Sequence, residues 1–134
     1  MKLLIDNNIS PHIAPAIHAL VAPDGHEVVS LRTKYPNHPK DVEWIGQLGI
    51  EGGWSVLSND IKITRRASER EAWRRTTLIG YFYAPSWSKL NRLQQASRLL
   101  LWWDRLVTQS SLIGGGALFE LPVNANSKLR QLQV

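Results

Sequence analysis

Acidic side chains follow apolar segments in the amino-terminal half of this sequence, in positions where they could bind a metal ion. Asp6 stands directly after the apolar run 3–5, and Asp60 stands shortly after a second apolar run. Asp41 and Glu43 lie between them in the sequence. The chain has eleven Asp and Glu residues in total. These four are therefore a large share of its acids.

The chemistry of such a group depends on what neutralises it. Carboxylates that lie together repel one another, so they persist mainly where a cation or a proton compensates them. The chain has no Cys, and its four His residues show no ligand spacing, so an oxygen-only site favours Mg²⁺ or Mn²⁺. Such ions hold phosphate groups and generate a hydroxide nucleophile for phosphodiester cleavage. We therefore predict a metal site formed by Asp6, Asp60 and Asp41 (or Glu43), with Asn8 orienting the carboxylates or donating to a phosphate oxygen.

Each of these residues also has an ordinary structural explanation. Asp6 and Asp60 are each next to Asn, a combination that is common in turns after a strand. Asp41 is well placed to cap a helix. Glu43 is two positions away and would point to a different side of that helix, so one of the two is expected as a ligand rather than both. Only their joint occurrence indicates a site.

The elements that would position these residues alternate between strand and helix patterns. Helical spacing of apolar residues begins after Ser10-Pro11, and Gly and Pro residues separate the segments. We predict strands at 2–6, 27–31, 54–58, 77–83 and 117–121, and helices at 10–21, 41–49, 65–75 and 88–109. This order predicts an α/β fold with a mainly parallel sheet and helices on both faces. Ligands of such sheets bind at the carboxyl ends of the strands, which is where Asp6 and Asp60 stand.

A basic segment follows Asp60 directly. It contains Lys62, Arg65, Arg66, Arg70, Arg74 and Arg75, with Glu69 and Glu71 among them. Its simplest interpretation is a solvated helix whose charges pair with one another. Because the cations outnumber the acids, the segment would also attract a phosphate backbone toward the predicted metal site.

Length and composition favour one domain, which we assign to residues 1–123, followed by a loose tail at 124–134. The chain has 134 residues, of which 43% are hydrophobic, and a formal net charge of +5. This charge favours polyanionic partners. We find no membrane-spanning run and no signal peptide, and we expect a cytoplasmic protein. The apolar helix 88–109 with Trp102-Trp103, which we assign to the core or to a subunit interface, raises the expectation of a homodimer.

The segments LLIDNNIS, HEVVSL, PKDVEWIGQLG and WSVLSNDIKITRRASERE, taken in this order, resemble the PIN-like domain superfamily. Within it the chain is most similar to PIN-like proteins grouped with VapC-type toxins of toxin–antitoxin pairs. The resemblance implies a three-layer α/β/α fold of about four to five strands. It also implies cleavage of RNA with Mg²⁺ or Mn²⁺ and a small antitoxin protein as partner. The family's first acid matches Asp6 in the motif Asp6-Asn7-Asn8, its helix acid matches Asp41 or Glu43, and a later acid matches Asp60, with Lys62 nearby.

The chain departs from that family at one position. Many PIN nucleases have a fourth acid near the end of a further strand, whereas the segment 83–86 after the fourth predicted strand contains no carboxylate. Glu69 or Glu71 is the alternative source of a fourth acid. Whether one metal or two would bind is therefore open.

We derive one main functional hypothesis and two alternatives. The main hypothesis is a metal-dependent endoribonuclease, the toxin of a toxin–antitoxin pair, in which Asn8 and Lys62 orient ligands or phosphate and Arg65 and Arg66 guide the RNA backbone. The first alternative is a PIN-like domain that has lost activity and binds nucleic acid or a protein partner. The second is a receiver-like signalling domain. It ranks last because Asn7-Asn8 stands where such proteins place paired acids.

Overall fold

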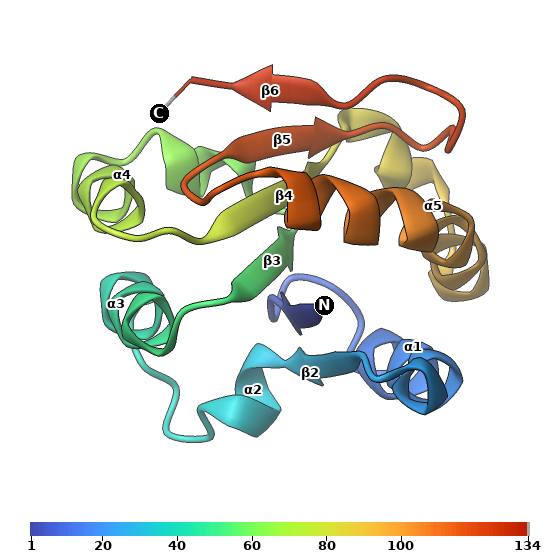
Figure 1. Cartoon of the computed structure of the whole chain (residues 1–134), viewed down its shortest axis with the longest axis horizontal. Coiled ribbons are helices and arrows are strands. Elements are labelled where there is room, and N and C mark those ends of the chain that lie inside the picture. Colours follow the sequence, from blue (N-terminus) through green and yellow to red (C-terminus); the bar gives the residue numbers. More distant parts are fainter. Residues whose placement is uncertain (134) are drawn as a thin grey trace.

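A computed structural model describes residues 1–133, and its centre is one six-stranded sheet in the order β2-β1-β3-β4-β5-β6 (Figure 1). The first five strands pair in parallel, and β6 pairs antiparallel with β5. The strands are β1 (Lys2–Ile5), β2 (Glu27–Ser30), β3 (Trp54–Ser58), β4 (Ile79–Tyr83), β5 (Leu118–Leu121) and β6 (Arg130–Leu132).

Helices cover both faces of this sheet. They are α1 (Ile13–Val21), α2 (Leu31–Lys34), α3 (Asp41–Glu51), α4 (Ala67–Arg74) and α5 (Arg92–Leu112), with the 3₁₀ turns η1 (Ala22–Asp24), η2 (Ile61–Thr64) and η3 (Pro85–Lys89). In Figure 1, α3 and α4 lie on one side of the sheet and α1 and α5 on the other. The predicted three-layer α/β/α fold is therefore confirmed.

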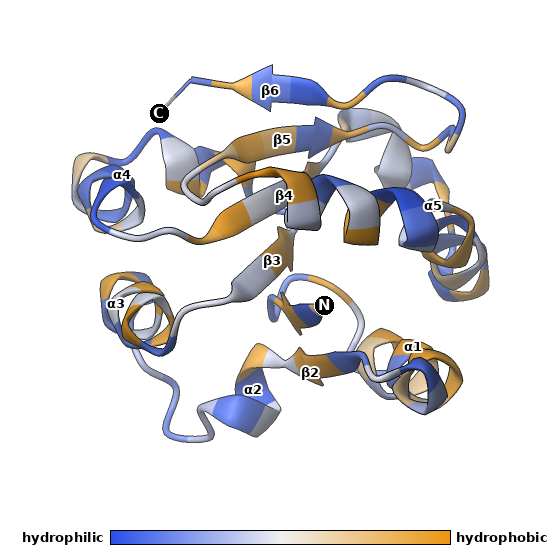
Figure 2. Ribbon diagram, in the orientation of Figure 1, coloured by the Kyte–Doolittle hydropathy of each residue, from blue (hydrophilic) through white to orange (hydrophobic). Residues whose placement is uncertain are grey.

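Two apolar cores separate along β1 because successive side chains of a strand point to opposite faces. Leu3 and Ile5 pack with α1 and α5, whereas Leu4 packs with α3 and α4. The apolar residues of α1 show clearly in Figure 2, and α4 and β6 are mostly hydrophilic. Packing on both faces explains why the first, third and fourth strands read as nearly continuous apolar runs.

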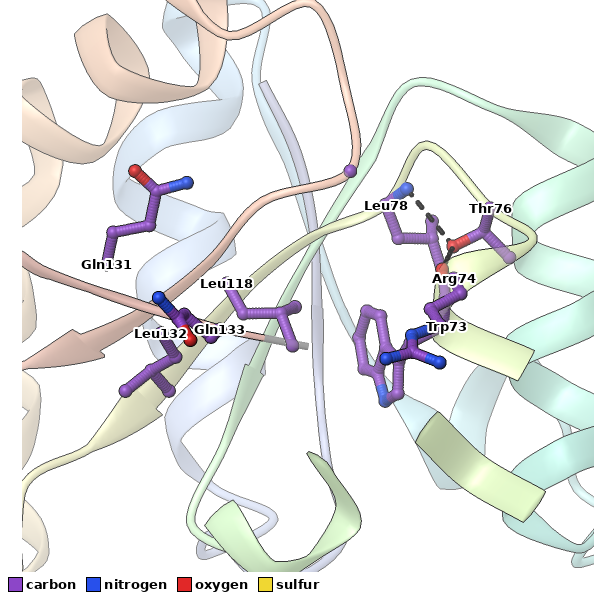
Figure 3. Close-up of a pocket in the computed structure, with 9 residues that line it drawn as sticks. Trp73, Arg74, Thr76, Leu78, Leu118, Gln131, Leu132 and Gln133 are labelled. Carbon is purple, nitrogen blue, oxygen red and sulfur yellow. Dashed lines mark hydrogen bonds between the residues drawn. The ribbon is translucent and has the colours of Figure 1, made fainter. Parts of the chain in front are cut away.

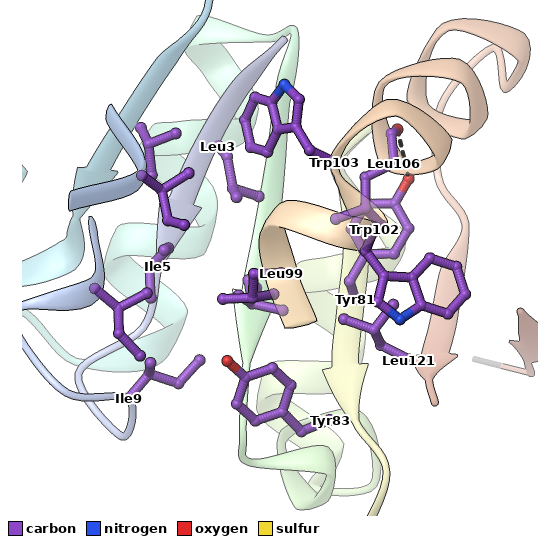
Figure 4. Close-up of a cluster of buried hydrophobic side chains, with 14 of the residues drawn as sticks. Leu3, Ile5, Ile9, Tyr81, Tyr83, Leu99, Trp102, Trp103, Leu106 and Leu121 are labelled. Carbon is purple, nitrogen blue, oxygen red and sulfur yellow. Dashed lines mark hydrogen bonds between the residues drawn. The ribbon is translucent and has the colours of Figure 1, made fainter. Parts of the chain in front are cut away.

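The helix α5 contributes Trp102 and Trp103 to the core shared with α1. Their exposed fractions are 0% and 7%, and the Trp102 indole N–H donates to the Pro122 carbonyl at 2.8 Å. Figure 4 shows both, with Leu99, among side chains of the sheet. Of the two predicted roles, the core role is the one that the burial of these residues matches.

Several local predictions differ from the structure; among them, the helix predicted at 88–109 begins at Arg92, after the 3₁₀ turn η3, and ends at Leu112. The helix α1 begins at Ile13 and not at Ser10, because the Ser10 hydroxyl accepts the His12 amide in a preceding turn. The segment between the predicted strand 27–31 and the predicted helix 41–49, for which the sequence predicts neither element, contains all but the first residue of the short helix α2, which is capped by the Ser30 side chain. The expected tail contains β6, which adds a sixth strand to the predicted four or five. No helix within residues 1–133 is long and apolar enough to cross a membrane.

Candidate metal centre at the strand ends

Asp6 is the most buried acid of the candidate site, with 8% of its surface exposed. Because β1 and β3 are paired, Asp6 lies next to Ser58 across the sheet. One carboxylate oxygen, Oδ2, accepts the Ser58 hydroxyl at 2.8 Å, and the other, Oδ1, accepts the Asn7 amide at 2.7 Å. Burial raises the pKa of Asp6, these hydrogen bonds lower it, and the charges of Asp41 and Asp60 raise it further. Asp6 is thus held in place at a site where a nearby cation would favour its charged form.

Asn8 joins the ends of β1 and β3. Its amide nitrogen donates to Asp6 Oδ2 at 3.3 Å and to the Ser58 hydroxyl at 3.2 Å, and its amide oxygen accepts the Asn59 backbone amide at 2.9 Å. The Asp60 amide donates to the same Ser58 hydroxyl at 3.0 Å. Asn8 therefore positions Asp6, and orienting a carboxylate is one of the two roles that the sequence predicts for it.

Ser58 is a residue of this site to which the sequence analysis gave no role. It is 1% exposed and connects Asp6, Asn8 and the backbone of Asp60. A small hydroxyl at the end of a buried strand, next to Asn59, is a signal that could have identified it. Its side-chain partners Asp6 and Asn8 are 52 and 50 positions away in the sequence, so their identity depends on the pairing of β1 with β3.

Asp60 and Asp41 are both close to Arg66. Asp60 Oδ1 accepts the Lys62 amide at 3.1 Å, and Asp60 Oδ2 accepts the Arg66 guanidinium at 2.8 Å. The same Arg66 nitrogen lies 3.6 Å from Asp41 Oδ2. Asp41 Oδ1 accepts the Trp44 indole N–H at 2.9 Å, which fixes the carboxylate at the start of α3. The hydrogen bond with Asp60 is the main cause of a raised pKa of Arg66.

Glu69 is the third acid that contacts Arg66. Its carboxylate lies 3.3 Å from Arg66 Nε, and its pKa is lowered mainly by the Ser68 hydroxyl and the local backbone. Glu71 is 3.1 Å from Arg75 instead. Of the two acids considered as a fourth ligand, Glu69 is therefore the one on the side of the site.

The remaining predicted site residues make fewer contacts with the acids of the candidate site. Glu43 is exposed and makes no ion pair within residues 1–133, so Asp41 is the member of that pair that the fold brings toward Asp60. Lys62 contributes its backbone amide to Asp60. Arg65 lies next to Arg66 in the sequence but lines a separate hollow beside α4 and β6.

The end of β4 confirms that a carboxylate is absent at the position of the family's fourth acid. Tyr83 stands there, 4% exposed, and its ring stacks on Trp87 with centroids 4.0 Å apart. Its hydroxyl is buried without a hydrogen-bond partner, and burial raises its pKa. This end of the strand is thus an aromatic part of the core.

The donor chemistry of the site suits a hard divalent ion, but the spacing of the acids does not. Across residues 1–133, no group of three or more His, Cys, Asp or Glu side chains is close enough to hold a metal ion. The cation among the acids is Arg66, which contacts Asp60, Asp41 and Glu69. In this conformation the guanidinium compensates the charge that a metal ion would compensate.

Comparison with known proteins places this arrangement in a family. A family model described as "PIN like domain" matches residues 1–85. This match spans β1 to β4 and every predicted site residue, whereas α5, β5 and β6 lie beyond it. No curated protein and no solved structure matches the chain. Because the match covers more than half of the sequence and its order of elements agrees with the fold, the chain belongs to the PIN-like domain family.

Proposed function

We propose that this protein is a metal-dependent endoribonuclease of PIN-like fold and the toxin of a toxin–antitoxin pair. The observation that carries the proposal is the position of Asp6. It is buried at the end of β1, fixed by Ser58 and Asn8, and close enough to Asp41 and Asp60 for their charges to raise its pKa. A carboxylate held in this way at a strand end is typical of a functional site.

The proposed roles follow from the contacts. Asp6, Asp41 and Asp60 would hold Mg²⁺ or Mn²⁺, which supplies a Lewis acid and an activated water for phosphodiester hydrolysis. Asn8 and Ser58 keep Asp6 in one orientation. Two cations, Lys62 and Arg65, pair with no carboxylate within residues 1–133 and remain free to contact substrate phosphates. The exposed Glu43 makes no ion pair within the same residues, so the contacts give it no role.

Arg66 has a place in this proposal as the counter-ion of the site before a metal ion binds. It contacts Asp60 at 2.8 Å and lies 3.6 Å from Asp41. Its side chain is 44% exposed, so it can turn into solvent without breaking the core. Metal binding would then release Arg66 toward the RNA backbone, where we expect it to guide the substrate together with Arg65.

A second candidate function is a binding module without catalytic activity. Two observations favour it: Arg66 already occupies the position of a cation between Asp41 and Asp60, and β4 ends on Tyr83 instead of an acid. Such a module would bind RNA or a protein partner and would need no metal ion. The two functions therefore differ in their metal dependence.

Cleavage of RNA during a titration with Mg²⁺ or Mn²⁺ tests the proposal. The informative variant is Asp6→Asn, which removes the charge but keeps the shape of the side chain. We expect it to lower the cleavage rate by about a hundredfold or more, because a metal ion supplies several kcal/mol of charge stabilisation in the transition state. The matched control is Asp24→Asn, an exposed acid in η1, which should cleave like the unchanged protein.

Circular dichroism would show that both variants fold. Undiminished cleavage by Asp6→Asn would remove the proposed site. RNA binding by the unchanged protein without any product at any metal concentration would instead establish the binding module.

The proposed partners need separate tests. If the protein is a toxin, its expression alone should arrest growth, and a small protein encoded next to it should restore growth when both are expressed. The proposed homodimer predicts a doubled mass in light scattering. Fractionation of cells tests the proposed cytoplasmic location.

A further inference from the structure

A trough runs between α4 on one side and β5 and β6 on the other. It consists of two hollows of about 650 and 260 Å³ that share Leu132 and Gln133 as lining residues. Figure 3 shows the larger hollow, with Trp73 and Arg74 of α4 on one side and Leu118, Gln131 and Leu132 of β5 and β6 on the other. The smaller hollow is lined by arginines and lies next to η2. We refer to the two hollows together as the trough.

Four arginines line the trough. Arg65, Arg70 and Arg130 belong to the smaller hollow and Arg74 to the larger one. Arg130 pairs with Glu120 on the neighbouring strand at 2.9 Å. The other three, Arg65, Arg70 and Arg74, make no ion pair with any acid between residues 1 and 133.

The arginines of the basic segment thus form two groups, one that pairs with acids and one that borders the trough. Arg66 and Arg75 pair with acids of the candidate metal centre or of their own helix. Arg70 and Arg74 are four positions apart on α4, so they share one face of the helix, and that face borders the trough. Three arginines that pair with no acid between residues 1 and 133 therefore lie along this trough.

Two buried N–H donors at the trough have no acceptor. They are Arg70 Nε and Trp73 Nε1, and neither has a hydrogen-bond partner in the structure. Trp73 is 3% exposed and lines the larger hollow. A buried donor without an acceptor is unfavourable, because it has lost its hydrogen bond to water without replacing it. Both groups can only donate at these atoms, so the group that would satisfy either of them is an acceptor such as a phosphate oxygen.

The trough begins where the candidate metal centre ends. The turn η2 connects Asp60 to Arg65, and Ile61 and Arg65 line the smaller hollow. A chain that leaves the acids along η2 would therefore meet Arg65 first, then Arg70, and then Arg74. The opposite wall, β6, lies outside the region that matches the PIN-like family, so it is a feature of this chain's own carboxyl-terminal segment.

We infer that the trough binds the phosphate backbone of single-stranded RNA. Unpaired guanidinium groups and donors without acceptors match phosphate oxygens in charge and in hydrogen bonding. A flexible single strand can follow hollows of this size. The inference takes RNA as the ligand from the proposed function. It requires binding only, so it holds for an active nuclease and for an inactive binding module alike.

Fluorescence anisotropy with a short fluorescein-labelled single-stranded RNA tests this inference. The full chain is used with EDTA, so that binding is measured without cleavage. The trough variant is the double substitution Arg70→Gln and Arg74→Gln. The matched control is Arg92→Gln with Arg98→Gln, which removes the same charge from exposed positions on α5, across the sheet.

We expect the trough variant to raise the Kd by about a hundredfold, since each lost charge-assisted hydrogen bond corresponds to about tenfold. The slope of log affinity against log salt concentration should fall by about 1.4, because each phosphate contact on a single strand contributes about 0.7. The control should change the Kd by less than about threefold, through its general loss of charge. Equal losses in the two double variants would overturn the inference.

Two further measurements keep the result unambiguous. If the trough variant does not fold, as judged by circular dichroism, Arg65→Gln with Arg74→Gln replaces it, because both of these side chains are exposed. Binding is measured in EDTA and cleavage is measured with Mg²⁺ or Mn²⁺, so a failure of cleavage and a failure of the trough remain distinguishable. The unchanged protein should bind a single-stranded DNA of the same sequence at least weakly. If it bound no DNA, and if the trough variant kept its full affinity for RNA, recognition of phosphate by the trough would also be contradicted.

Discussion

The candidate metal centre and the trough lie on either side of one short segment, η2 with α4, and they differ in how their charges are compensated. At the metal centre, Asp60 and Asp41 share Arg66, and Asp6 is held by the hydroxyl and amides around it. In the trough, Arg65, Arg70 and Arg74 have no acidic partner within the described chain, and a donor of Arg70 is buried without an acceptor.

This difference shows how the same basic segment can serve two purposes. A charge with an internal partner has a fixed position and must exchange that partner before it can bind anything else. A charged side chain without a partner can bind a ligand immediately. When a polyanion such as RNA neutralises it, the release of counter-ions from the polyanion favours binding. The unpaired arginines of the trough should therefore bind RNA without first breaking an ion pair, whereas the acids should bind a metal ion only after Arg66 has moved.

Removing the internal partner at the metal centre tests the acids of this comparison directly. Arg66→Ala should increase the affinity for Mn²⁺ by about fivefold, because the acids then lose a competing cation that is close but solvent-screened. Isothermal titration calorimetry with Mn²⁺ and no RNA measures this directly. The result does not depend on cleavage activity.

The neighbouring residue provides the control for that experiment. Arg65→Ala removes the same charge one position earlier, but Arg65 lines the trough and contacts no acid. It should change the Mn²⁺ affinity by less than about twofold and should weaken RNA binding instead. If both variants changed the Mn²⁺ affinity equally, Arg66 would be only one contributor to a general positive field. The proposed difference between the metal centre and the trough, in how their charges are compensated, would then be wrong.

An effect of similar size is expected at Asp6, the acid of the proposed metal-binding trio without a cationic partner within residues 1–133. Asp6→Asn should raise the free energy of unfolding by about 1 kcal/mol at neutral pH, because the buried carboxylate is desolvated and repelled by Asp41 and Asp60. Chemical denaturation at several pH values measures it. An unchanged or lower stability at neutral pH would show that the hydrogen bonds from Ser58 and Asn7 outweigh burial.

The pH dependence of that difference has a defined sign. Burial raises the pKa of Asp6 in the folded protein above its ordinary value. The folded state therefore binds the proton more tightly than the unfolded state does, and ionisation of Asp6 costs stability. The stability of the unchanged protein, measured relative to Asp6→Asn, should be highest below the ordinary pKa of Asp6 and should decrease as the pH rises through the raised value.

The fold could be predicted from the sequence where local signals and burial agree. Residues 54–58 were predicted as a strand with the bounds that β3 has, because an apolar run there lies between Gly-Gly and Asn-Asp. That Asp6 and Asp60 lie near each other also followed from the sequence, since neighbouring parallel strands end at the same edge of a sheet. These inferences need only the order of the elements.

Other features could not be predicted because they depend on contacts between distant residues. Arg66 was assigned to the RNA backbone, yet its guanidinium contacts Asp60 and Asp41, a choice that requires α3 and α4 to be side by side. The strand β6 is three residues long and has no apolar alternation, so only its pairing with β5 defines it. Without β6, the sequence gives no second wall for the arginines of α4.

The smallest expected effect concerns the pair Glu71 and Arg75, which tests whether a matched charge matters when it is exposed. The two side chains are four positions apart on α4, 3.1 Å from each other, and 52% and 78% exposed. Glu71→Gln should lower the free energy of unfolding by only about 0.3 kcal/mol, as expected for an exposed helical pair. Thermal unfolding should show a decrease in Tm of about 1 °C. The RNA affinity of the same variant should increase slightly, because Arg75 then joins the unpaired cations of α4. A marked loss of stability would instead mean that this ion pair, and not the packing of Trp73, holds α4 beside the trough.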